Sequence, residues 1–238
     1  MIKLIAIIFF STLLVARGYD APDNRSQVKN LLKMMDLDYK IAPLTGCSYN
    51  YDITSCMDKT IVDTRLCNVS EVNQTIKWIQ VVPDWFFGRH MDCMNKDICT
   101  NVFTKEKFGS PMCCRRVNPK YKMMEADLFN LIPAISKVAS KRESRLFFDV
   151  VKPEFSVGNL KFDDDFIEPR DEVKGDIARV YLYMDARYDL NLSKQQKETY
   201  FRWHALDPVD RHECSVAKII LKVQGGENSL VEEGCTKD

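Results

Sequence analysis

Nine cysteines are the feature that most constrains how this chain of 238 residues can fold. They follow an N-terminal segment typical of a signal peptide, in which Lys3 precedes an apolar run over 4–16 and Gly18 precedes the predicted cleavage point. An exported chain enters an oxidising compartment, where cysteines usually form disulfides. We therefore predict a signal peptide over 1–18 and a secreted or periplasmic, disulfide-stabilised domain over 19–238.

A zinc site is the alternative use of the cysteines. It is disfavoured because the sequence has no Cys-x-x-Cys pair and its three histidines are scattered. Nine is an odd number, so at least one thiol is free or bonds to a second chain. No later segment is apolar over the roughly 20 residues that span a membrane, so we expect no membrane partner after cleavage. Sequons for N-glycosylation begin at Asn24, Asn68, Asn73 and Asn191.

The charge balance argues against a protein that binds mainly through phosphate contacts. The whole chain has 34 basic and 34 acidic residues, and loss of the signal peptide removes two of the basic ones, for a net charge of −2. Proteins that bind nucleic acid without sequence specificity are usually basic. A local basic groove is still compatible with this balance.

Hydrophobic periodicity predicts one α+β domain with more helix than strand. Apolar residues at helical spacing indicate helices over 26–37, 124–139 and 175–188. Pro133 should kink or divide the second of these. A further helix is expected after Ser193, where Gln196 completes a capping box.

The remaining segments are predicted to be strands, turns or loops. Short strands are expected over 78–82 and 146–151, and the run of aspartates over 163–165 reads as a solvated turn. Residues 44–75 are polar and read as loops. Residues 88–120 contain four cysteines and show little hydrophobic periodicity, which indicates an irregular segment that disulfides hold in place.

Several stretches, in this order and spacing, occur together in one family of proteins. They are WIQVVPDWFFG at 78–88, MEADLFNLIPAI at 124–135, GDIARVYLYM at 175–184, LSKQQ at 192–196, Pro208-Val209, Glu213-Cys214, Gln224-Gly225, Asn228 and Cys235. Over roughly residues 40–235 the chain resembles the endonuclease I family of exported, Ca/Mg-dependent, non-specific nucleases. The resemblance implies a mainly helical single domain with a small antiparallel sheet and a ββα-metal core, also called His-Me finger.

In that family, a strand of the core carries an acidic metal ligand followed by the catalytic histidine, and a later asparagine binds the metal. Here the two strand positions are Ile79 and Gln80. The asparagine is kept as Asn130, although its usual preceding histidine is Phe129. The asparagine expected after the motif helix aligns with Ala139.

These departures should impair phosphodiester hydrolysis. Gln80 can orient water but cannot take its proton, and a general base contributes about 10²–10⁴ in rate. Ile79 offers no oxygen to a hard cation, and Asn130 alone is a weak neutral ligand, so we expect no cofactor or weakly bound Mg or Ca. The favoured interpretation is a pseudonuclease that keeps a binding role, with DNA, RNA or a protein as partner.

Two alternatives remain open. An active nuclease with a variant site would use Asn130 together with Asp84, Glu125, Asp127 or His90. A disulfide-rich secreted interaction protein would use its spare thiol to join a second chain.

The resemblance also suggests nucleic-acid contacts. Lys96 is the nearest equivalent of a family arginine that lies near the scissile phosphate, in a loop that is shortened here. Arg142 and Arg145 follow the motif helix, close to where the family binds DNA, although a plain solvated face explains them as well. Arg179 either contacts phosphate or pairs with a carboxylate, and the second is favoured.

The disulfides expected from the resemblance join Cys47 with Cys56, Cys93 with Cys99, and Cys214 with Cys235. A further bridge from Cys67 to Cys113 or Cys114 would leave one thiol over.

Overall fold

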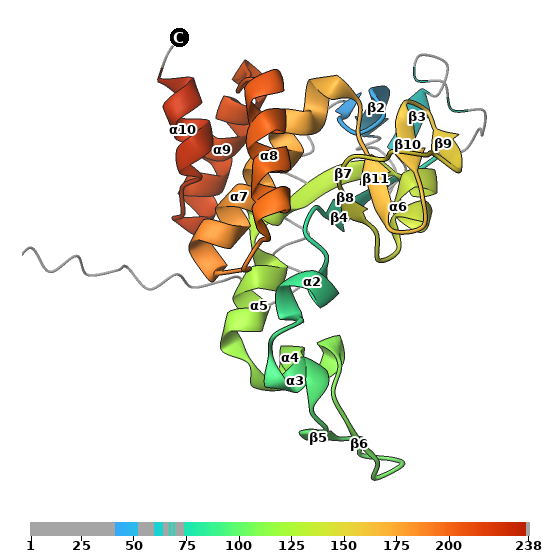
Figure 1. Cartoon of the computed structure of the whole chain (residues 1–238), viewed down its shortest axis with the longest axis vertical. Helices are drawn as coiled ribbons and strands as arrows, with labels where there is room; N and C mark the ends of the chain where they lie inside the picture. The colour runs from blue at the N-terminus through green and yellow to red at the C-terminus, as the bar shows by residue number, and fades with distance from the viewer. Residues whose placement is uncertain (1–40, 52–59, 64–66, 68, 70–73, 237–238) are drawn as a thin grey trace, which may run out of the picture.

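The computed structural model of the chain describes residues 41–51, 60–63, 67, 69 and 74–236. These residues form helices and several small sheets, which confirms the predicted α+β class (Figure 1). The predicted helix over 26–37 and the predicted signal peptide lie outside the described residues. Within the described part of the chain, no helix combines the length and apolar composition needed to cross a bilayer.

The bounds of the elements are as follows. The helices are α2 (Asp84–Gly88), α3 (Asp92–Asn95), α4 (Pro111–Val117), α5 (Pro119–Ala126), α6 (Ser136–Arg142), α7 (Lys174–Tyr188), α8 (Lys194–Leu206), α9 (Arg211–Gln224) and α10 (Ser229–Cys235), with 3₁₀ turns η1 (Leu128–Asn130) and η2 (Asp171–Val173). The strands are β1 (Ile41–Ala42), β2 (Cys47–Tyr51), β3 (Thr60–Asp63), β4 (Ile76–Gln80), β5 (Cys99–Thr100), β6 (Lys107–Phe108), β7 (Leu131–Ile135), β8 (Leu146–Phe147), β9 (Phe155–Val157), β10 (Leu160–Phe162) and β11 (Phe166–Glu168).

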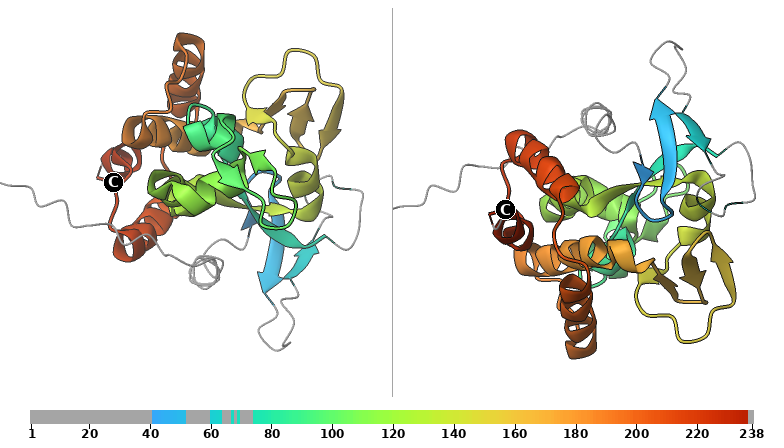
Figure 2. Two further views of the ribbon diagram at one scale, coloured as in Figure 1. Left: turned by 90° about the horizontal axis from the view of Figure 1, so that it is seen from below. Right: turned by 90° about the horizontal axis from the view of Figure 1, so that it is seen from above.

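Helix α7 is the centre of the helical part, with α8, α9 and α10 gathered around it (Figures 1 and 2). Its buried side chains recur at helical spacing, as predicted, at Ile177, Tyr181 and Met184. The start of α7 lies so close to the end of α8 that a Cβ on Gly175 would be 1.9 Å from the carbonyl oxygen of Asp207. Only glycine therefore permits this approach.

Caps and a disulfide fix the ends of the surrounding helices. The capping box predicted at Ser193 and Gln196 is present at the start of α8. The bridge predicted between Cys214 and Cys235 is confirmed, and it ties α9 to α10.

The two larger sheets lie on the other side of the molecule from α10 (Figure 2). One has the order β1-β2-β3 and another β8-β11-β10-β9, in which only the β8–β11 pair is parallel. The aspartate turn over 163–165 is confirmed, because the Asp163 carboxylate accepts from the backbone N–H groups of Asp165 and Phe166. The strand predicted over 146–151 is only the two residues of β8. Residues 44–75 were predicted as loops, which is wrong for β2 and β3.

The helix predicted over 124–139 is wrong. The segment contains the end of α5, the turn η1, strand β7 and the start of α6. Residues 132–135 are all buried, so the segment shows no strand alternation and its apolar run also fits a helix. Pro133 sits opposite Trp78 in the two-stranded sheet of β4 and β7, where a strand with one free edge tolerates the missing N–H.

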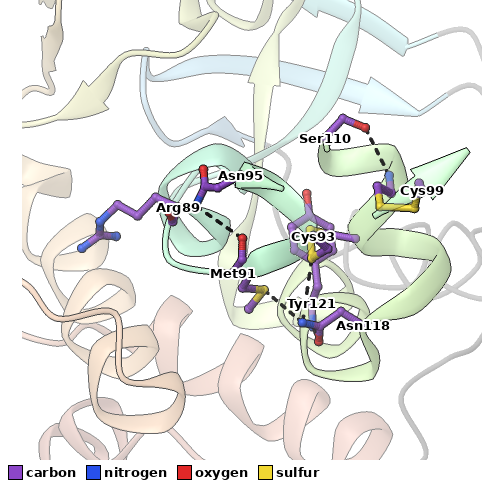
Figure 3. Close-up of a disulfide and its surroundings, with 10 residues drawn as sticks. Arg89, Met91, Cys93, Asn95, Cys99, Ser110, Asn118 and Tyr121 are labelled. Carbon is purple, nitrogen blue, oxygen red and sulfur yellow. Dashed lines mark hydrogen bonds between the residues drawn. A yellow bond between two sulfur atoms is a disulfide. The ribbon is translucent and has the colours of Figure 1, made fainter. Parts of the chain in front are cut away.

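Residues 88–120 form a projection that we call the disulfide arm, seen at the bottom of Figure 1. Two bridges pin it, as predicted, but they join Cys93 with Cys114 and Cys99 with Cys113. The pairing Cys93–Cys99 is wrong because the hairpin of β5 and β6 returns the chain so that α4 packs beside α3. The Ser110 hydroxyl caps α4 by accepting from the backbone N–H of Cys113, and Figure 3 shows Asn118 beside the Cys93 sulfur.

The pairing expected near the N-terminal end of the domain is also wrong. Cys47 bonds to Cys67, with 5.0 Å between their Cα atoms, rather than to Cys56. Cys67 is therefore not available to Cys113 or Cys114. Cys56 lies outside the described residues.

Candidate functional site at the ββα core

Strands β4 and β7 and helix α6 form the ββα unit that the resemblance predicts. The strands are antiparallel, with Ile79 opposite Ile132 and Gln80 opposite Leu131. Helix α6 follows β7 directly, contacts β4 and carries Ala139. The unit therefore brings the three substituted positions, 79, 80 and 139, onto adjoining elements.

The side chains at these three positions offer little chemistry. Ile79 and Gln80 are half-buried, and Ile79 packs against the hydrophobic core. Ala139 is half-buried and presents only a methyl group. Phe129, where the family has a histidine, is buried with its ring 4.9 Å from that of Tyr183.

The side chain of Asn130 binds the main chain of Val82 through two hydrogen bonds. It is fully buried, and its Oδ1 accepts from the backbone N–H of Val82 at 2.7 Å. Its Nδ2 donates to the carbonyl oxygen of the same residue at 2.9 Å, and its own carbonyl oxygen accepts from the Val81 N–H. Both ends of the carboxamide are hydrogen-bonded to Val82, so in this structure Asn130 fixes the main chain at the end of β4.

Arg142 also binds the main chain at the end of β4. Its side chain is buried, and Nη2 donates to the carbonyl oxygen of Val81 at 2.8 Å, beside the hydroxyl of Tyr181 at 3.2 Å. The guanidinium lies 4.8 Å from the centre of the Phe147 ring. Burial lowers the pKa of Arg142, and the neighbouring Arg145 adds to the effect. The structure therefore places this guanidinium inside the protein and not at the surface, where the predicted nucleic-acid contact would be made.

Arg145 and Lys96 differ in how far they are exposed. The Arg145 side chain is 14% exposed, and its Nε donates to the carbonyl oxygen of Asp163 at 2.7 Å. The Lys96 side chain is 64% exposed and forms an ion pair with Asp92 at 2.9 Å, on the disulfide arm. Of the predicted phosphate contacts, Lys96 is therefore the one with the most accessible charge.

Arg179 is fully buried in an ion-pair network, which confirms the carboxylate alternative. Its Nε and Nη2 donate to the two carboxylate oxygens of Glu213, at 2.7 and 2.5 Å. A second carboxylate, from Asp176, accepts at 3.0 Å. The network joins α7 to α9 and places Arg179 away from the surface, where the predicted contact with nucleic acid would be made.

The acids considered for a variant nuclease site are already paired. Asp84 and Glu125 both accept from Arg115, which links α2, α4 and α5. Burial alone would lower the pKa of Arg115, but the hydrogen bond and charge of Glu125 outweigh it and raise the pKa. His90 is exposed on the disulfide arm.

Asp127 is fully buried and serves as a hub between η1, α7 and α9. Its carboxylate accepts from the hydroxyls of Tyr183 and Tyr188 at 2.8 and 2.7 Å and from the Gln224 amide at 2.7 Å. Burial and the negative charge of Asp127 raise the pKa of both tyrosines above the usual range. The sequence contains no pattern that predicts this hub, because its members lie up to 97 residues apart.

The described residues contain no group of three or more histidine, cysteine or acidic side chains placed to hold a metal ion. At the ββα core, a hard divalent cation would need oxygen ligands. Ile79 and Ala139 have none, Gln80 has one neutral amide oxygen, and the Asn130 oxygen is bound to Val82. The residues present at positions 79, 80, 130 and 139 therefore do not fit Mg or Ca.

Comparisons with known proteins agree with the architecture. A family model described as endonuclease I matches residues 14–235. Endonuclease-1 of Buchnera aphidicola subsp. Acyrthosiphon pisum (strain APS) is 31% identical over 166 residues, 68% of this chain and 61% of the relative. An extracellular deoxyribonuclease of Aeromonas hydrophila is 34% identical over 165 residues, which are 67% of this chain and 66% of the relative.

A third relative, Endonuclease-1 of Buchnera aphidicola subsp. Baizongia pistaciae (strain Bp), is 28% identical over 247 residues, 98% of this chain and 94% of the relative. The chain thus spans less than two thirds of the first two relatives and nearly all of the third.

Proposed function

Because the chain belongs to the endonuclease I family, we propose that it is an exported, nuclease-related protein that binds nucleic acid but is impaired in cleaving it. The family membership supports an endonuclease I-like scaffold. A relative is named an extracellular deoxyribonuclease, which supports a location outside the cytoplasm, secreted or periplasmic, and DNA as the first nucleic acid to test.

The observation that carries the proposed impairment is the pair of residues at the end of β4. Ile79 and Gln80 stand where the family has its acidic metal ligand and its histidine base. A glutamine has no titratable group near neutral pH, so it cannot hold the proton of the attacking water. Because loss of a base and loss of a metal ligand act on the same transition state, their effects need not add.

The surroundings of the two positions support a retained scaffold. The main chain just after Gln80 is held by Asn130, Arg142 and Tyr181. None of these contacts involves the side chain at position 79 or 80. The site would therefore keep its backbone geometry while lacking the groups that activate water and neutralise the phosphate.

A nuclease assay on the mature protein tests the proposal. Plasmid DNA and RNA are incubated with the wild-type chain and with the triple variant Ile79→Glu/Gln80→His/Ala139→Asn, in Mg²⁺ or Ca²⁺. We expect little metal-dependent cleavage by the wild type. If the scaffold is intact, the variant should gain activity, since a restored general base is worth about 10²–10⁴ in rate.

Controls separate restored chemistry from a surface effect. Lys77→His places a histidine on the same strand at an exposed position, and it should leave activity at the wild-type level. Cleavage by the wild-type chain above a heat-inactivated control, and dependent on added metal, would contradict the proposed impairment. A gel shift with the same DNA tests the binding role separately, and loss of that role would leave a protein partner as the alternative.

A further inference from the structure

We propose that the tip of the disulfide arm binds an anionic lipid surface. The arm is the part of the molecule farthest from helices α7–α10 in Figure 1, with β5, β6 and the loop between them at its end. This loop carries Val102 and Phe103, whose side chains are 61% and 90% exposed. A single exposed apolar residue is ordinary, but an almost fully exposed phenylalanine beside a second apolar residue marks an interaction site.

The apolar residues of the arm form a larger set. Five of the ten large hydrophobic residues that are exposed in the described chain belong to it: Ile98, Val102, Phe103, Met112 and Val117. Ile98 and Met112 each precede one half of the Cys99–Cys113 bridge, so the disulfide holds their main chains close together. The set is mostly aliphatic, which favours contact with hydrocarbon over stacking on nucleic-acid bases.

The charge of the arm complements an anionic surface. Residues 88–120 contain seven lysines or arginines and three acidic residues, for a net charge of +4, whereas the whole chain balances 34 against 34. Lys105 and Lys107 follow the apolar residues of the tip, one on each side of Glu106, and both are exposed. Basic residues next to membrane-inserted apolar side chains add electrostatic attraction to anionic headgroups.

The loop at the tip satisfies most of its own main-chain N–H groups, which lowers the cost of entering an apolar interface. Asn101 accepts from the backbone N–H groups of Phe103 and Thr104 through its side chain, and from that of Lys105 through its carbonyl oxygen. The Lys105 ammonium donates to the carbonyl oxygen of Val102 at 2.9 Å. The backbone N–H of Glu106 is directed at the Thr104 hydroxyl.

Sedimentation with lipid vesicles tests this proposal. The mature wild-type chain is mixed with vesicles of phosphatidylcholine alone and of phosphatidylcholine with phosphatidylglycerol. We expect binding to the anionic vesicles that weakens as salt is added. Phe103→Asp should lower the partition coefficient about tenfold or more, because it removes a fully exposed aromatic anchor.

The matched control is Phe201→Asp, which changes a phenylalanine that is 53% exposed on α8, away from the arm. This variant should bind vesicles as the wild type does, and circular dichroism should show both variants folded. Equal vesicle binding by Phe103→Asp and wild type, or no binding of the wild type to anionic vesicles at low salt, overturns the proposal.

Nucleic acid is the other macromolecule that fits a basic surface. A parallel titration with a single-stranded oligonucleotide distinguishes nucleic-acid binding at the tip from lipid binding. If Phe103→Asp loses oligonucleotide binding and keeps vesicle binding, the tip contacts nucleic acid and the lipid proposal is wrong. Neither outcome depends on whether the ββα core cleaves DNA, so this test is independent of the proposed function.

Discussion

Replacing Asn130 with aspartate distinguishes a clamp on the main chain from a metal ligand. Aspartate keeps an oxygen for the Val82 N–H but cannot donate to the Val82 carbonyl, which Asn130 contacts at 2.9 Å. Leaving that buried carbonyl without a hydrogen-bond donor lowers the free energy of unfolding by about 1–3 kcal/mol. The new carboxylate would also be buried, since position 130 is 0% exposed. A buried unpaired charge further lowers the free energy of unfolding, on the order of a few kcal/mol.

We therefore expect Asn130→Asp to lose about 3–5 kcal/mol of the free energy of unfolding at neutral pH. For a domain of this size, each kcal/mol corresponds to a fall of about 2–4 °C in Tm. Burial should raise the pKa of the new carboxyl above its unfolded value of about 3.9, so the folded state binds the extra proton. The variant should then recover stability relative to wild type as the pH falls toward that unfolded value.

Urea denaturation followed by circular dichroism, at neutral and mildly acidic pH and with and without Ca²⁺, measures all of these quantities. A metal ligand behaves in the opposite way, because aspartate binds a hard cation better than asparagine does. The reasoning is refuted if Asn130→Asp is as stable as wild type at neutral pH and gains stability only when Ca²⁺ is added.

Three further predictions concern the stability and covalent structure of the domain. Replacing the buried Arg179 with methionine leaves Glu213 and Asp176 without their cation, and urea denaturation should show a loss of about 3–5 kcal/mol; a loss near zero would mean that the network is not stabilising. Burial would raise the pKa of Glu168, but hydrogen bonds from Lys174 and the Val150 N–H outweigh it and hold the pKa below its usual value. That stabilisation is present above the unfolded pKa and is lost as pH falls through the lower folded pKa. The cost of Lys174→Met should therefore be greatest near neutral pH and shrink in acid; a cost that does not vary with pH contradicts this. Mass spectrometry of unreduced peptides should recover the pairs Cys47–Cys67, Cys93–Cys114, Cys99–Cys113 and Cys214–Cys235 and no peptide that joins Cys93 to Cys99.

Local patterns predicted helices α7 and α8 well, whereas no helix was predicted for α9 or α10. Helix α7 shows a regular apolar stripe, and α8 begins at a capping box formed by Ser193 and Gln196, which are only three positions apart. These features depend on neighbours in sequence, so they are visible without a structure. Strand β7 was missed because its side chains are buried on both faces and its partner, β4, lies about 50 residues earlier. Nothing within 124–139 itself distinguishes that strand from a buried helix.

The disulfides and the site were only partly predictable for a related reason. Cys113 and Cys114 are adjacent in sequence yet bond to different partners, and the choice depends on how the β5–β6 hairpin returns the chain. The resemblance predicted a ββα unit, and β4, β7 and α6 form one. It could not show that Asn130, Arg142 and Arg179 are buried within the protein, because burial is a property of the three-dimensional packing.

The way in which the end of β4 is held has a consequence for how this protein can evolve. Val81 and Val82 are fixed by Asn130, Arg142 and Tyr181, and all of these contacts go to main-chain atoms. The hydrogen bonds that hold this strand end are therefore independent of the side chains at positions 79 and 80, where Ile79 contributes packing against the core. Substitutions at these two positions would leave those hydrogen bonds in place, so the fold constrains position 79 through packing and not through its polar contacts.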